Sequence, residues 1–237
     1  MLERYVVLDL EMTGLNPKRD RIIEIGAARI EKGIVIEKCE TFVNPGITIP
    51  EKVTEITGIT DDMVASAPEI TDILAKVLTF LGEDVLVGHN LIFDYSFLKQ
   101  AAINEKCSFE KQGVDTLKIA RKVLPDLEHR TLEYLCEYYG ISRENGHRAL
   151  CDAIATAELL ERLKKEYGEK FFELFEPKAL IYKAKRQTPA TKNQLQRLKE
   201  LIDYHKIGMD IDFEHLTRSE ASRLTDKILS THGKIPS

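Results

Sequence analysis

The first third of the chain alternates apolar and polar residues with the period of β-strands. Residues 5–10 form a β-rich run that ends in acidic residues, residues 21–30 place apolar side chains on one face, and residues 34–43 form a third extended stretch. Residues 31–33 fit a hairpin turn between the second and third stretches. Three sequential strands joined by short turns predict an antiparallel meander.

After residue 49 the apolar period changes to that of helices. Pro50 can open a short helix that ends at Gly58, and Ser66 and Glu69 have the spacing of a capping box before a helical apolar pattern. Short strands are expected at residues 84–87 and around Val114, and helices at residues 70–81, 92–103, 116–123, 131–139 and 149–167. This order predicts an α/β fold in which a mixed sheet carries helices on its faces.

The last quarter of the chain has a different organisation. A basic linker is expected over residues 177–190, after a first domain of residues 1–176. Residues 191–237 contain two further capping boxes, at Thr191/Gln194 and Thr217/Glu220. They predict a small helical module.

Charge is distributed unevenly between these parts. The net charge is −5, but residues 1–177 hold 22 Lys and Arg against 32 Asp and Glu, whereas residues 178–237 hold 12 against 7. A basic tail on an acidic body fits either nucleic-acid contact or a docking or structural role, and the sequence leaves both open.

The composition argues against several classes of protein. The hydrophobic fraction is 43% and the charged fraction 31%, as in soluble globular proteins. No apolar run approaches the roughly 20 residues of a transmembrane helix, and Glu3, Arg4 and Asp9 interrupt any signal-peptide core. The four cysteines lack zinc-ligand spacing. We expect a cytoplasmic protein with reduced thiols and no membrane partner.

Two carboxylates stand out at the end of the first strand. Asp9 and Glu11 are two residues apart, so their side chains point to the same face and repel each other. At about 4 Å and an effective dielectric near 20, such a pair costs about 4 kcal/mol. Either the strand emerges into water at Asp9, or the pair has a chemical role.

Two later segments repeat the pattern of carboxylates at element boundaries. Asp94 lies just inside a helix that follows Gly88, where it either complements the helix dipole or faces a site. His147 precedes the helix that contains Asp152, and three alanines of this helix would allow close packing: Ala149, Ala153 and Ala157. The alternative is an exposed Asp152 and a loop histidine.

Taken together, the three segments resemble the DEDDh family of 3′–5′ exonucleases, also called DnaQ-like. The matching segments are residues 9–15, 89–94 and 147–153, and residues 53–63 resemble the family's loop after the third strand. The resemblance covers roughly residues 4–163. It implies a ribonuclease H-like mixed sheet, as in the proofreading exonuclease subunit of bacterial replicative DNA polymerase.

Four carboxylates brought together require cations, and carboxylate oxygens suit Mg²⁺ or Mn²⁺. The resemblance implies two such ions. Asp9 would bridge both, Glu11 and Asp152 would hold one, and Asp94 would support the other. His147 would be the general base, since an ordinary histidine pKa of about 6.5 suits that task.

The resemblance also implies a set of substrate contacts, which are Met12, Thr13, Gly14, Leu15, His89, Asn90 and Phe93. Gly14 would let the backbone approach the nucleotide, Leu15 would wedge against the terminal base, and Phe93 would pack near the sugar or base. Core packing is an equal alternative for Phe93. His89 and Asn90 are interpreted as turn residues that shape the site.

The implied reaction is hydrolysis from a 3′ end that releases nucleoside 5′-monophosphates. Single-stranded DNA is the favoured substrate and a DNA polymerase or another replication protein a possible partner, in proofreading or repair. The sequence does not choose between DNA and RNA, nor between a proofreading subunit and a stand-alone enzyme. Two alternatives without catalysis stay open: a silent nucleic-acid-binding module on an exonuclease fold, and a carboxylate cluster that binds a structural cation.

Overall fold

The computed structural model describes residues 2–143, 146–209, 211–214 and 216–235. The chain divides into two compact units, Met1–Ala184 and Lys185–Ser237. None of the helices in these described ranges is long and apolar enough to cross a membrane.

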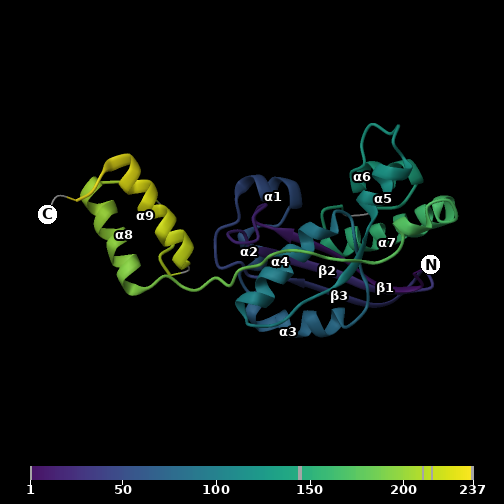
Figure 1. Ribbon diagram of the computed structural model, residues 1–237, viewed down its shortest axis with the longest axis horizontal. Coiled ribbons are helices and arrows are strands. Elements are labelled where there is room, and N and C mark those ends of the chain that lie inside the picture. The colour runs from purple at the N-terminus through teal and green to yellow at the C-terminus, as the bar shows by residue number, and fades with distance from the viewer. Residues whose placement is uncertain (1, 144–145, 210, 215, 236–237) are drawn as a thin grey trace. The chain divides into compact units, whose positions relative to one another are not determined.

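The larger unit is built on a mixed sheet that is flanked by helices (Figure 1). The sheet has six strands in the order β3-β2-β1-β4-β5-β6. Its strands are β1 (Arg4–Met12), β2 (Ile22–Glu31), β3 (Ile34–Phe42), β4 (Leu86–Gly88), β5 (Gln112–Asp115) and β6 (Lys178–Ala179). The first three pair antiparallel, which confirms the predicted meander, while β4 and β5 continue the sheet in parallel with β1.

Helices cover both faces of this sheet. The helices of the larger unit are α1 (Glu51–Thr57), α2 (Asp61–Val64), α3 (Ile70–Leu81), α4 (Leu91–Asn104), α5 (Thr116–Val123), α6 (Leu132–Tyr139) and α7 (Ala149–Tyr167), with a 3₁₀ turn at Phe172–Leu174. One core joins Val6 and Leu8 of β1 to α3 and α4, and the other joins Tyr5 and Val7 to α5, α6 and α7. Successive side chains of β1 point to opposite faces of the sheet, and this alternation decides which helices each side chain contacts.

Local signals in the sequence account for several boundaries. Lys32 and Gly33 both have positive φ in the predicted hairpin turn, and Gly58 ends α1 in the left-handed conformation. The capping box of α3 was expected at Ser66 and Glu69, and that expectation is wrong. The box is formed by Glu69 and Asp72, because the helix begins only at Ile70.

The start of α7 packs directly on the sheet. A Cβ atom on Gly26 of β2 would lie 2.1 Å from the backbone carbon of Ala149 and the nitrogen of Leu150. Ala149 and Ala153 are fully buried at this contact, as the small side chains predict. Gly26 pairs with Asp9 across the β1–β2 ladder, so the glycine brings α7 next to that carboxylate.

We expect Gly26→Ala to destabilise the larger unit by about 3 kcal/mol, because overpacking at this contact must shift backbone rather than a flexible side chain. Urea unfolding followed by circular dichroism measures the change. Gly208→Ala is the control, since open space surrounds that glycine and its φ is not left-handed. A Gly26→Ala protein as stable as the control would contradict the close packing of α7.

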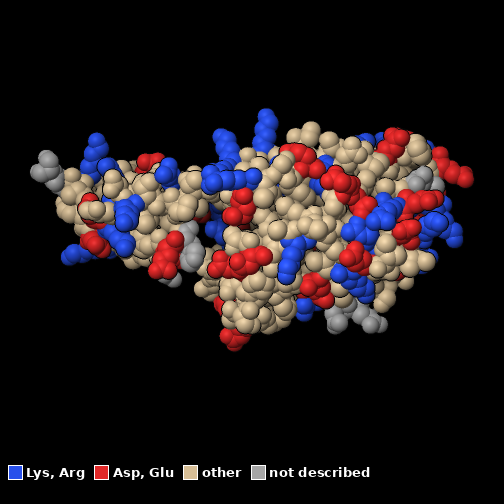
Figure 2. Space-filling model, turned by 90° about the horizontal axis from the view of Figure 1, so that it is seen from below, with Lys and Arg blue, Asp and Glu red and all other residues tan. Residues whose placement is uncertain are grey.

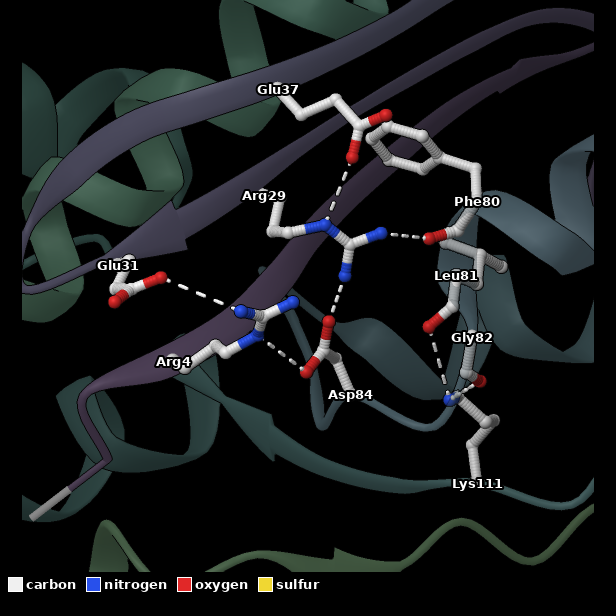
Figure 3. A network of polar contacts seen from close by, with 9 residues as sticks. All are labelled: Arg4, Arg29, Glu31, Glu37, Phe80, Leu81, Gly82, Asp84 and Lys111. Carbon is white, nitrogen blue, oxygen red and sulfur yellow. Dashed lines mark hydrogen bonds and ion pairs between the residues drawn. The ribbon is translucent and has the colours of Figure 1, made fainter.

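A partly buried ion-pair network ties together the opposite end of the sheet (Figure 3). Arg29 of β2 is only 12% exposed, and its guanidinium donates to the Asp84 carboxylate, to the Phe80 carbonyl and to Glu37, the last at 3.0 Å. Arg4 of β1 donates to the other Asp84 oxygen at 3.2 Å. These contacts join β1, β2, β3 and the end of α3, and they satisfy the Arg29 guanidinium beneath α3.

The boundary between the units lies later than the sequence suggested. A linker was expected to begin at residue 177, but Lys178 and Ala179 pair with β5, and Leu180 is buried beside Gly113. The division falls between Ala184 and Lys185. A two-residue strand with charged and exposed side chains carries too little pattern to be recognised as part of a sheet.

The smaller unit consists of α8 (Lys192–His205) and α9 (Arg218–His232) around a core that includes Leu198, Leu201 and Ile228. Both predicted capping boxes are present, at Thr191/Gln194 and at Thr217/Glu220. Basic and acidic side chains alternate on the face of this unit drawn in Figure 2. Its excess of basic charge is therefore spread out rather than gathered into one patch on that face.

Candidate active site

Strand β1 supplies the first two carboxylates. Asp9 and Glu11 alternate with Leu8 and Leu10, which belong to the core under α3 and α4. Both carboxylates therefore face the side covered by α7. Neither side chain is exposed to the extent expected of a strand that ends in water, so that alternative does not hold.

Helix α4 brings Asp94 to the same place. Asn90 precedes the helix in the left-handed conformation, and Asp94 lies in its first turn with 5% of its surface exposed. Its Oδ1 accepts a hydrogen bond of 3.1 Å from the backbone nitrogen of Leu10, the residue between Asp9 and Glu11. The Asp94 carboxylate is thus attached to β1 itself rather than only to its own helix end.

Helix α7 contributes Asp152, which is 5% exposed. Arg143 binds it through two parallel bonds, Nε to Oδ1 at 2.6 Å and Nη2 to Oδ2 at 2.7 Å. The backbone nitrogen of His147 also donates to Oδ2, at 3.2 Å. Ligand atoms of Glu11, His147 and Asp152 all lie within 4.8 Å of one another.

His147 is held at this position by the neighbouring ion pair. It has a left-handed φ of 66°, and the next residue, Arg148, donates to Oε1 of Glu24 at 3.0 and 2.6 Å. Glu24 is fully buried on β2 opposite Glu11, and its other oxygen accepts from the nitrogen of Ala149 at 3.1 Å. Glu24 therefore anchors Arg148 and Ala149, the two residues that follow His147 at the start of α7.

Burial and mutual repulsion make these carboxylates hard to ionise. Burial, followed by the charges of Asp94, Glu11 and Asp152, raises the pKa of Asp9 well above its ordinary value. Burial, with Asp152 next in importance, raises the pKa of Glu11 to about 8, and burial raises that of Asp94 to about 7. Arg143 opposes the shifts of Asp9 and Glu11.

These pKa values predict how the stability of the metal-free protein depends on pH. Glu11 and Asp94 ordinarily titrate at 4.5 and 3.8, so the folded state holds protons that the unfolded chain has released. Stability conferred by this difference is lost as pH rises through about 5 to 8. In EDTA, the free energy of unfolding measured with urea should fall as pH rises, and Glu11→Gln should make this fall shallower. Equal pH profiles for the two proteins would contradict the raised pKa of Glu11.

The residues fit divalent cations. The donors are carboxylate oxygens, which Mg²⁺ and Mn²⁺ prefer, and the raised pKa values mark a local excess of negative charge within the described residues. Asp9, Glu11, Asp94 and Asp152 could share such ions.

A groove leads to the four carboxylates. Its volume is about 650 Å³, a size typical of ligand sites, and it is open to solvent. Its lining residues are Asp9, Leu10, Glu11, Met12, Thr13, Gly14, Leu15, Pro50, Lys52, Val53, Ile56, Thr57, His89, Phe93, Asp94, Leu132, Arg143 and Asp152. Leu15 is 81% exposed at this groove and Ile56 is 52% exposed. An apolar rim with one lysine and an acidic end suits a nucleotide.

The predicted substrate residues occupy different positions. Met12, Leu15 and Phe93 line the groove, and Phe93 also stacks edge-on with Phe97 at 5.4 Å. Thr13 and Gly14 line it too. Thr13 is 4% exposed, and its hydroxyl and backbone nitrogen both bond to the backbone of Arg21. A Cβ on Gly14 would lie 2.6 Å from the Asp20 carboxyl, which is a flexible side-chain end that can move aside, so packing alone does not require glycine here.

His89 and Asn90 shape the turn into α4, as the sequence indicates. The His89 ring bonds to the Thr116 hydroxyl at 2.9 Å and the Arg130 carbonyl at 2.8 Å, with one edge on the groove. The backbone nitrogen of Asn90 donates to Asp115, and Asn90 is not among the described residues that line the groove.

Sequence reasoning missed part of the groove. A short helix between Pro50 and Gly58 was predicted, but not that this helix, α1, would form a wall of the groove with Lys52, Val53 and Ile56. Arg143 was missed because no motif includes it. Glu24 was missed because a single acidic residue in an apolar strand gives no indication of which distant residues it contacts.

Comparisons with known proteins identify the family of the chain. The model of the exonuclease family RNase T matches residues 6–160. The epsilon subunit of DNA polymerase III from Aquifex aeolicus is 37% identical over 168 residues, covering 70% of this chain and 83% of that protein. The PolC-type DNA polymerase III of Clostridium perfringens is 42% identical over 167 residues, but the match spans only 12% of its length and 70% of this chain.

Solved structures of exonucleases share the fold. Exonuclease X in complex with 5′-overhanging duplex DNA gives a TM-score of 0.58 at 25% identity, covering 69% of this chain and 93% of that chain. Exonuclease I of Escherichia coli with a dT13 oligonucleotide gives 0.65 at 21% identity, covering 73% and 44%. The chain therefore belongs to the DnaQ-like exonuclease family and has its ribonuclease H-like fold.

Proposed function

We propose that the protein is a metal-dependent 3′–5′ exonuclease that hydrolyses the terminal phosphodiester bond of DNA and releases nucleoside 5′-monophosphates. The observation that carries the proposal is the convergence of Asp9, Glu11, Asp94 and Asp152, from three separate elements, at the end of one groove. Repulsion between these buried carboxylates would be selected against in a purely structural site. The family membership supports the same reaction.

The four carboxylates can be assigned to two cation positions. Asp9 is central, because Asp94, Glu11 and Asp152 all act on its pKa. We assign Asp9, Glu11 and Asp152 to one cation, and Asp9 with Asp94 to a second. Two Mg²⁺ or Mn²⁺ ions bound there would orient the phosphodiester and stabilise the attacking and leaving oxygens.

His147 is assigned the role of general base. Its ring lies beside Glu11 and Asp152, and Glu24 and Arg148 hold the adjacent backbone. A histidine near neutral pH can take the proton from the attacking water and release it to solvent. The left-handed backbone at His147 is consistent with a side chain whose position is imposed by the site.

The groove supports binding of a strand end. Leu15, Ile56 and Phe93 offer apolar surface for the terminal base and sugar, and Lys52 offers a positive charge for a phosphate. Stacking and apolar contact with a base do not depend on its identity, so we expect little sequence preference. Relatives named as DNA polymerase III components make single-stranded DNA at a mispaired 3′ end the favoured substrate.

A polarity assay tests the proposal. An oligonucleotide labelled at its 5′ end should be shortened stepwise with Mg²⁺ or Mn²⁺ and remain intact in EDTA, with mononucleotides as the first products. A matched RNA and a duplex with paired or mispaired 3′ ends measure the preference. Faster hydrolysis of the mispaired end would support proofreading.

The controls separate the proposal from its alternatives. A 3′-terminal phosphorothioate should slow shortening, whereas the same group at the 5′ end should not. Metal-dependent thermal stabilisation without any shortening would favour a structural cation site. Tight oligonucleotide binding without hydrolysis would favour a silent binding module.

A further inference from the structure

Arg143 occupies a position that the proposed reaction does not explain. Its guanidinium forms a two-bond fork with Asp152, and the two side chains are only 13% and 7% exposed. Arg143 also lines the groove that leads to Asp9 and Glu11. A cation of the protein therefore lies within the cluster that we assign to metal ions.

The fork consumes most of the bonding capacity of Asp152. An ionised carboxylate offers about four lone-pair sites. Oδ1 accepts from Nε of Arg143, and Oδ2 accepts from Nη2 of Arg143 and from the His147 backbone. One position on Oδ1 remains, so a divalent ion cannot use both Asp152 oxygens while the fork is present.

Packing supports this placement of the guanidinium. A Cβ on Gly146 would lie 3.0 Å from Cζ and Nη1 of Arg143, so the guanidinium rests against a residue without a side chain. Arg143 also opposes the raised pKa values of Asp9 and Glu11. It thus supplies positive charge that two buried carboxylates need when no ion is bound.

We infer that Arg143 is an internal counter-ion that competes with the divalent cation for Asp152. The inference rests on the proposed function, because it takes Asp152 as a metal ligand. In the metal-free protein the guanidinium neutralises the cluster. Binding of a divalent ion through both Asp152 oxygens then requires the fork to open, and an ion on the remaining Oδ1 position would lie beside the guanidinium and be repelled by it. Arg143 therefore lowers the affinity of the site for metal.

Direct metal binding tests the inference without an activity assay. Free Mn²⁺ is measured by electron paramagnetic resonance while the full-length protein is titrated in the absence of DNA. Arg143→Gln should bind Mn²⁺ about tenfold or more tightly than the wild type, since charged, forked hydrogen bonds are among the stronger ones in proteins. Its metal-free form should melt at a lower temperature, and its thermal gain on adding Mn²⁺ should be larger.

Two variants separate competition from a general charge effect. Arg162→Gln removes the same charge from the exposed part of α7, where Arg162 pairs only with Glu158 among the described residues, and should leave Mn²⁺ affinity within about twofold of wild type. Arg143→Lys keeps the charge but loses the planar fork, and should bind Mn²⁺ more tightly than wild type and less tightly than Arg143→Gln.

The outcomes distinguish the inference from the function on which it rests. Unchanged or weaker Mn²⁺ binding by Arg143→Gln would overturn the competition, as would an Arg143→Lys protein with wild-type affinity. If the wild type and all variants failed to bind Mn²⁺, the proposed metal-dependent function itself would fail.

Discussion

Asp9→Asn should reduce exonuclease activity by about 10³-fold or more while making the metal-free protein more stable. Asp9 is the carboxylate on which the other three act, so its loss weakens both proposed cation positions. Metal ions contribute several kcal/mol to stabilising charge in a transition state, and about 4 kcal/mol corresponds to 10³ in rate. Single-turnover hydrolysis at saturating Mn²⁺ measures the rate.

The thermal stability of metal-free Asp9→Asn provides a second, independent test. Asparagine has nearly the same shape but no charge, so it removes the repulsion with Glu11, Asp94 and Asp152. A gain of about 1 kcal/mol would raise the melting temperature in EDTA by roughly 2–4 °C. Asp126→Asn, at an exposed loop position, is the matched control and should change neither property. An Asp9→Asn protein that is inactive but also less stable would point to a structural role for Asp9.

His147→Asn should lower kcat by about 10²–10⁴-fold, the contribution typical of general base catalysis. Asparagine is chosen because it tolerates the left-handed φ of 66° at this position and cannot accept the proton. The same substitution at His129, an exposed histidine outside the groove, is the control.

Metal binding separates the two roles open to His147. If the ring acts only as a base, the affinity for Mn²⁺ stays within a few-fold of wild type while kcat falls. A large loss of Mn²⁺ affinity would make His147 a ligand instead of a base. Normal activity in His147→Asn would remove it from the mechanism.

The sequence was most informative where local pattern and chemistry coincide. The alternation of β1 placed Asp9 and Glu11 on one face, and the small residues of α7 indicated the close packing that brings in Asp152. The hairpin, the meander and the Thr-initiated helices followed from turn and capping chemistry. These features depend on neighbours in sequence, which a pattern can report.

The features that the sequence did not reveal depend on contacts between distant segments. Asp94 was predicted as a site residue, but its hydrogen bond from the backbone nitrogen of Leu10, 84 residues away, was not. Glu24 is recognisable as an anchor only once Arg148 and Ala149 lie over it, at separations of 124 and 125 residues. Arg143 belongs to no motif, and nothing local in the helix predicted between Pro50 and Gly58 links it to the carboxylates.

Anomalous X-ray scattering from crystals soaked in Mn²⁺ with a nucleoside 5′-monophosphate tests whether the four carboxylates hold two cations. We expect two peaks about 3.5–4 Å apart. One should be bound by Asp9, Glu11 and Asp152 and the other by Asp9 and Asp94, with the Arg143 fork open. Peaks only at other surfaces, or carboxylates that stay unligated at saturating Mn²⁺, would contradict this assignment.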